Sequence, residues 1–148
     1  YTTENIVVYT GTHDNDTTAG FFESAPEMLK RNVVDYLKLK GALPQVIKPK
    51  VQELKATQKV VEQKKAPVPK VTQTAKELTE ALVKAAFLSK ARYCVIPLQD
   101  VYALKTEARM NTPSTTGSNW AWRMEANLID ESSAQKLLSL TKESGRIS

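Results

Sequence analysis

Two short runs of β-branched and aromatic residues, each followed closely by polar residues, constrain the fold of this chain most strongly. The first run spans residues 6–10 and leads into a polar cluster that contains His13 and Asp14. The second spans residues 93–97 and leads into Asp100. Apolar runs of this length are typical of strands that are buried in a parallel sheet. Polar side chains beyond the carboxyl ends of such strands perform the chemistry of α/β barrels, so a functional site is one interpretation of this pattern.

The first polar cluster has a second interpretation. Asp and Asn side chains hydrogen-bond their own backbone, so residues 13–16 are equally typical of a simple Asx turn after a strand. Taken alone, this stretch does not decide between a turn and a site.

Helices are predicted between and after the two strands. Three segments have the form of a capping box followed by apolar residues at helical spacing: residues 24–27, 74–77 and 132–135. They predict helices over residues 25–40, 74–90 and 132–144, with Gly41 and Gly145 as stop signals after the first and the last. Residues 19–22, which include two phenylalanines, are predicted to form a loop. The alternation of strands and helices predicts a parallel α/β fold.

The middle of the chain differs in composition from both ends. Between Lys48 and Lys76 there are eight lysines against two glutamates, and four prolines interrupt residues 42–73. Subtracting this local excess of six from the net charge of +5 leaves −1 for the rest of the chain. We therefore divide the chain into residues 1–41, a Lys/Pro-rich insertion over 42–73 that we expect to be exposed and flexible, and residues 74–148.

Composition argues against several classes of function. The basic charge is local and has no interleaved aromatic residues, which argues against nucleic-acid binding. A chain with one histidine and one cysteine cannot supply a zinc site by itself, and Cys94 lies in an apolar run where it is expected to pack as a small hydrophobe. No apolar run approaches the roughly 20 residues that a membrane-spanning helix needs, so no membrane partner is expected.

Residues 104–127 have little periodicity and contain both tryptophans, which lie close to Arg109 and Arg123. One interpretation is a surface loop that is held by its aromatic side chains. The other is a loop that faces carbohydrate, because aromatic rings stack on sugar rings while Asn and Arg side chains bind hydroxyl groups. We expect the two arginines to form ion pairs that support the loops.

Four short motifs resemble, in order, those of one enzyme family. They are YTGTHDN at residues 9–15, IPLQDV at 96–101, ARMNTP at 108–113 and NWAWR at 119–123. Together they resemble the C-terminal part of 4-α-glucanotransferases of the amylomaltase (disproportionating enzyme) type, glycoside hydrolase family 77. The resemblance covers residues 5–42 and 73–146, whereas the lysine-rich middle departs from the family pattern.

The resemblance implies about the last two β/α units of a (β/α)8 TIM barrel, in which the two predicted strands are the seventh and eighth. Members of the family move a segment of α-1,4-glucan from a donor to the 4-hydroxyl of glucose or another glucan, with retention and without a cofactor. The expected partners are a maltooligosaccharide donor, a glucose or glucan acceptor, and the rest of the barrel. Retaining mechanisms use a nucleophilic carboxylate and an acid/base carboxyl about 5–5.5 Å apart.

The resemblance also implies roles for particular residues. Asp14 matches a third carboxylate that stabilises the transition state, and His13 would hydrogen-bond the same sugar. Asp16 is expected to be a loop or capping residue. The side chains expected to line or brace the acceptor side are Asn111, Gln99, Asp100 and Trp120.

The family's nucleophile and acid/base would lie upstream of residue 1, so this chain is expected to be inactive alone. A whole barrel takes about 250 residues, which is more than this chain of 148 supplies. Both the cytoplasm and the plastid are compatible with the sequence. Two alternatives stay open. One is a related α-glucan hydrolase or debranching transferase, and the other is a non-catalytic module whose basic segment binds RNA or an acidic protein.

Overall fold

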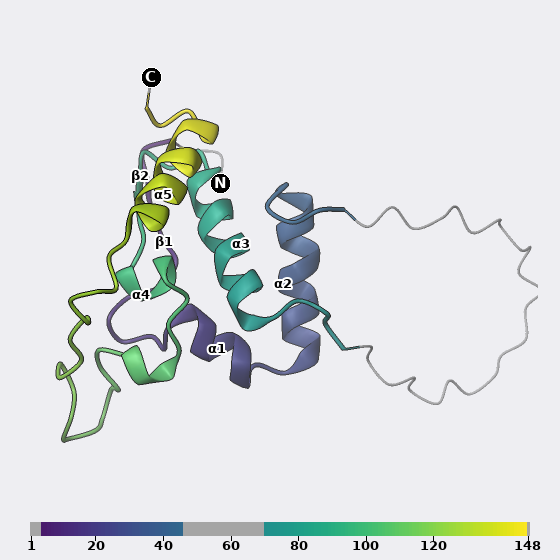
Figure 1. Cartoon of the computed structure of the whole chain (residues 1–148). Helices are drawn as coiled ribbons and strands as arrows, with labels where there is room; N and C mark the ends of the chain where they lie inside the picture. Colours follow the sequence, from purple (N-terminus) through teal and green to yellow (C-terminus); the bar gives the residue numbers. More distant parts are fainter. Residues whose placement is uncertain (1–3, 46–69, 148) are drawn as a thin grey trace, which may run out of the picture.

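Two parallel strands and a set of helices form the described part of the chain, which in this computed structural model comprises residues 4–45 and 70–147. The elements are, in order, β1 (Val7–Tyr9), α1 (Thr18–Ser24), α2 (Glu27–Leu39), α3 (Ala75–Phe87), β2 (Tyr93–Val95), α4 (Leu98–Val101), the 3₁₀ helix η1 (Thr106–Ala108) and α5 (Glu131–Glu143). In Figure 1, α3 runs between α2 and the pair of strands. The predicted α/β class is confirmed.

The strands β1 and β2 pair in parallel, with Val8 opposite Cys94 and Tyr9 opposite Val95. The expectation that both strands are buried is wrong. Tyr9 is 54% exposed and Val95 is 44% exposed, whereas Val8 and Cys94, which point to the opposite face, are only partly exposed. In the described residues, one face of this two-stranded sheet therefore lacks the cover that would bury it.

The hydrophobic core lies among three helices. Its buried members are Phe22 of α1, Val34 and Leu37 of α2, and Leu78 and Ala81 of α3. Residues 19–22 are thus part of a helix, and the prediction of a loop there is wrong. Thr17 caps this helix by accepting a hydrogen bond from the backbone N–H of Gly20, an N-cap that the phenylalanine-rich stretch did not suggest.

The three predicted capping boxes have different outcomes. Thr74 and Glu77 form a reciprocal capping box at the start of α3, as predicted. Pro26 is the N-cap of α2 and makes no side-chain cap. Asp130 caps α5, two residues before the predicted start, because its carboxylate accepts the backbone N–H of Ser133. The predicted stop signals Gly41 and Gly145 follow their helices with φ angles of 71° and 66°.

The flanks of the lysine-rich segment pack against the core. Ala42, Leu43 and Val71 are partly buried against it, and the backbone N–H of Val71 donates to Glu27 Oε2 over 2.8 Å. This hydrogen bond, chiefly, lowers the pKa of the Glu27 carboxyl. The prediction of a flexible insertion falls mainly on residues 46–69, which lie outside the described residues. Within the part of the chain that the structure describes, no helix has the length and apolar character to cross a membrane.

Candidate functional site

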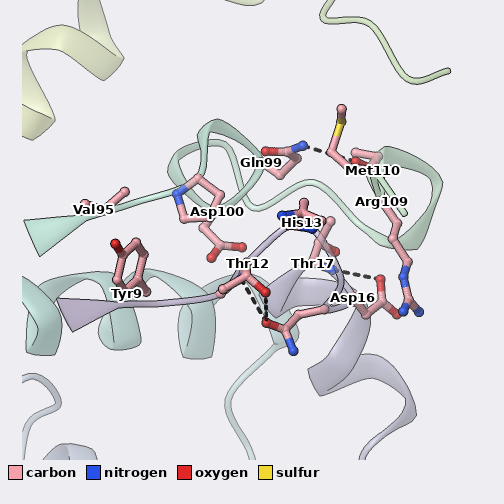
Figure 2. Close-up of a pocket in the computed structure, with 14 residues that line it drawn as sticks. Tyr9, Thr12, His13, Asp16, Thr17, Val95, Gln99, Asp100, Arg109 and Met110 are labelled. Carbon is pink, nitrogen blue, oxygen red and sulfur yellow. Dashed lines mark hydrogen bonds between the residues drawn. The ribbon is translucent and has the colours of Figure 1, made fainter. Parts of the chain in front are cut away.

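A cavity of about 510 Å³ opens beyond the carboxyl ends of both strands. Figure 2 shows side chains from three segments around it: the end of β1 with the loop that follows, the end of β2 with α4, and the segment after η1. The lining residues are Tyr9, Gly11, Thr12, His13, Asn15, Asp16, Thr17, Val95, Pro97, Gln99, Asp100, Ala108, Arg109 and Met110. The two polar stretches that the sequence singled out therefore meet at one site.

Asp14 lies beside this cavity, although it is not among the lining residues. Its Oδ1 accepts a hydrogen bond from Asn111 Nδ2 over 2.6 Å and lies 3.3 Å from Nε2 of His13. The backbone N–H of Asn111 also donates to the carbonyl oxygen of His13. The Asp14 side chain remains 50% exposed, so its carboxylate is held in place and still accessible to a ligand.

Trp120 extends the same cluster. Its ring centroid lies 5.0 Å from that of His13, at an interplanar angle of 37°. Trp120 has a φ of 64°, a left-handed conformation that costs a non-glycine residue about 1–3 kcal/mol. Its backbone N–H donates to the carbonyl of Met110 over 2.7 Å, and its own carbonyl accepts from Arg123. These bonds hold a half-exposed indole ring beside the imidazole.

Gln99 and Asp100 lie on α4. Gln99 Nε2 donates to the carbonyl of Ala108 over 3.3 Å. Asp100 is 2% exposed, and its carboxylate accepts hydrogen bonds from Thr10 and Thr18. Both residues line the cavity, where the Gln99 Nε2 atom and both Asp100 carboxylate oxygens are bonded to the protein itself.

The two arginines support the loops in a different way from the one expected. Arg109 donates from Nε to the carbonyl of Asn111 and from Nη2 to the carbonyl of Asp14, each over 2.8 Å. Arg123 donates from Nη1 to two backbone carbonyls. Among the described residues neither guanidinium forms an ion pair, so the expectation of ion pairs is wrong. The acceptors are carbonyl groups that the loops leave without backbone partners.

Asp16 braces the loop. Its Oδ1 accepts the backbone N–H of Thr17 and its Oδ2 accepts the hydroxyl of Thr106, over 2.8 and 2.9 Å. Gly20 of α1 packs directly against this contact. A Cβ atom there would lie 2.9 Å from the backbone nitrogen of Thr106.

Replacing Gly20 with alanine is therefore expected to destabilise the junction between α1 and η1. Alanine favours a helix by about 0.5–1 kcal/mol, but overpacking against backbone costs about 1–3 kcal/mol, so the second effect prevails. Faster hydrogen exchange of the α1 amides would show it. Gly11→Ala is the matched control, because its nearest contact of 3.9 Å leaves room for a methyl group. Slower exchange in Gly20→Ala would contradict the prediction.

Several lining residues are not predicted as site residues from the sequence, and the apolar ones among them are Tyr9, Val95, Pro97, Ala108 and Met110. Tyr9 and Val95 are register partners at the ends of the two strands. Side chains alternate between the two faces of a strand, so Tyr9 and Val95 share one face, whereas a continuous apolar run predicts a strand that is buried on both faces.

No group of three or more His, Cys, Asp or Glu side chains in residues 4–45 and 70–147 is placed to bind a metal ion. Cys94 is partly buried on β2, and burial raises the pKa of its thiol. A thiol with a raised pKa is a poor nucleophile at neutral pH, which agrees with the interpretation of Cys94 as a small hydrophobe.

Comparisons with known proteins agree on one family. The family model for 4-alpha-glucanotransferase (glycoside hydrolase family 77) matches residues 1–129. The chain is 31% identical over 147 residues to the chloroplastic/amyloplastic 4-alpha-glucanotransferase of Solanum tuberosum, covering 97% of this chain and 20% of that protein. It is 32% identical over 142 residues to the 4-alpha-glucanotransferase of Thermus thermophilus, covering 96% of this chain and 23% of that protein.

A solved structure is similar as well. The amylomaltase from Streptococcus agalactiae in complex with acarbose superposes with a TM-score of 0.70 at 25% identity, covering 99% of this chain and 23% of that one. The chain thus spans about a fifth of the length of the curated relatives it matches.

Proposed function

Because the chain belongs to the 4-alpha-glucanotransferase family, we propose that it is the C-terminal portion of a (β/α)8 barrel enzyme that transfers α-1,4-glucan segments with retention. The parallel pairing of β1 with β2 and the helices between them support two β/α units. The uncovered face of Tyr9 and Val95 would then face the barrel interior.

The observation that best supports this proposal is the contact between Asn111 Nδ2 and Asp14 Oδ1, over 2.6 Å. It joins two motifs of the family that are far apart in the sequence, and it leaves the Asp14 side chain half-exposed. In our proposal Asp14 stabilises the oxocarbenium-like transition state electrostatically, while the nucleophile and the acid/base come from the rest of a longer protein.

The remaining site residues would bind the sugar around this carboxylate. His13 Nε2 lies 3.3 Å from Asp14 Oδ1, so the imidazole would hydrogen-bond hydroxyls of the same sugar. Trp120, held half-exposed in a strained conformation, offers a face on which a sugar ring could stack. Asn111 orients Asp14, and Gln99 lines the acceptor side. The substrates would be a maltooligosaccharide donor and a glucose or glucan acceptor, in cytoplasm or plastid.

A chimaera tests this function. In it, the present chain replaces the matching segment of the Thermus thermophilus relative. We expect the chimaera to convert maltotriose to glucose and longer maltooligosaccharides, and the present chain alone to convert none, because one stabilising carboxylate cannot perform a double displacement. The measurement is product analysis by chromatography.

Each other outcome has a distinct meaning. Release of only shorter sugars by the chimaera would favour the alternative of an α-glucan hydrolase. A chimaera that is folded by circular dichroism but inactive, or activity of the present chain by itself, would contradict the proposal.

A further inference from the structure

A buried carboxylate closes the base of the loop that contains Asp14. Asp100 Oδ2 accepts the hydroxyl of Thr10 over 2.6 Å and the hydroxyl of Thr18 over 2.8 Å, and its Oδ1 accepts the backbone N–H of Thr18 over 2.9 Å. Thr10 follows directly after β1 and Thr18 begins α1, so one side chain from α4 binds both ends of residues 11–17.

Apart from this contact, surface hydrogen bonds and not core packing fix the conformation of the loop. Residues 12–15 are exposed, so packing in the core cannot position them. Hydrogen bonds within the loop join Thr12 to Asn15, bonds from Arg109 and Asn111 hold its tip, and the hydroxyl of Thr106 donates to Asp16. Because Asp100 joins the two ends of the loop, its loss would free the base to shift, and displacing a catalytic group by about 1 Å can lower a rate about 10²-fold.

We infer that Asp100 is a positioning residue, which acts on the reaction through Asp14 and does not bind the sugar. This inference rests on the proposed function. A buried carboxylate whose two oxygens accept three hydrogen bonds from the protein has little capacity left for a ligand, even though the residue borders the cavity.

The first test is the kinetics of Asp100→Ala in the chimaera. We expect kcat to fall about 10²-fold while the KM for maltotriose and for glucose changes less than about 3-fold. Asp100→Asn keeps an acceptor for the Thr18 amide and should recover part of the rate. A rise of about tenfold or more in either KM with an unchanged kcat would overturn the inference, because a sugar ligand would behave in that way.

A double-mutant cycle excludes a general loss of folding. In the Asp14→Asn background, Asp100→Ala should lower kcat by less than about 2-fold, because the group that it positions is already gone. Leu78→Ala is the matched control: it removes a buried side chain of the helical core, and its effect on kcat should be equal in both backgrounds. Equal effects of Asp100→Ala in both backgrounds would overturn the inference.

Amide hydrogen exchange separates this inference from the proposed function. Asp100→Ala should raise the exchange rate of the Thr18 and Asn15 amides about 100-fold and leave that of the α2 amides unchanged, whether or not the chimaera is active. An unchanged rate in the loop would overturn the positioning role. Full activity of Asp14→Asn would instead overturn the proposed function.

Discussion

Replacing Asp14 with asparagine in the chimaera is expected to lower kcat for maltotriose disproportionation about 10³-fold with little change in KM. Asparagine has the size of aspartate, and its amide oxygen can accept the hydrogen bond that Asn111 Nδ2 now donates to Asp14 Oδ1 over 2.6 Å. The geometry of the loop should therefore be retained. What disappears is the negative charge beside the developing oxocarbenium ion. A group that acts mainly in the transition state affects kcat and leaves ground-state binding nearly unchanged.

Asp16→Asn is the control for this experiment. Asp16 lies two residues away, has the same chemistry, and accepts hydrogen bonds from Thr17 and Thr106. Its replacement should lower kcat less than about 5-fold, because an amide oxygen can still accept one of these bonds. Equal losses in the two variants would mean that the loop, and not the Asp14 charge, is what the reaction requires.

Arg146→Ala is expected to release α5 from the rest of the domain. α5 has no buried residue, so apolar packing contributes little to holding it. Arg146 follows this helix and donates to three backbone carbonyls at and beyond the end of α3, those of Phe87, Ser89 and Ala91, over 2.9–3.0 Å. Hydrogen bonds from a charged donor contribute about 1.5–3 kcal/mol each, and a cation near a helix C-terminus adds to this.

We expect hydrogen exchange of the α5 amides to accelerate about 100-fold in Arg146→Ala, which corresponds to about 3 kcal/mol of lost docking free energy. In Arg146→Lys the exchange rate of the α5 amides should lie between those of the unmodified chain and of Arg146→Ala, because an ammonium group cannot reach three carbonyls as the planar guanidinium does.

Lys136→Ala is the control. It removes the surface ion pair with Glu80, at 2.7 Å, and pairs of this kind contribute at most about 1 kcal/mol, so exchange should rise less than about 5-fold. Protection of α5 that survives Arg146→Ala would show that other contacts dock this helix.

Local sequence patterns predicted a helix correctly where a few neighbouring residues are enough to define its start. The capping box of Thr74 and Glu77 defines the start of α3, because both partners lie three residues apart and need no tertiary contact. The same pattern failed at Pro26, whose helix starts without a side-chain cap. Local patterns also did not identify α1, because Phe22 and Gly20 favour this helix only when α3 and η1 are packed beside it.

The site was predictable in part. The four motifs identified the family and named His13, Asp14, Asn111 and Trp120, which the structure brings into one cluster. The functions of these residues remain predictions. The prediction that Arg109 supports the loops through ion pairs is wrong, since its residue type suggests charged partners whereas the geometry supplies backbone carbonyls.

By itself, the sequence determined the order of the two strands and of helices α2, α3 and α5, the parallel α/β class and the family. Each of these follows from periodicity or from a few adjacent residues. Only the tertiary structure decided which face of the strands is exposed, and that the Asp100 carboxylate bonds Thr10 and Thr18. The physical reason is distance along the chain. Asp100 lies 90 residues from Thr10 and Asn111 lies 97 from Asp14, and hydrogen bonds at that separation exist only after the intervening helices have packed.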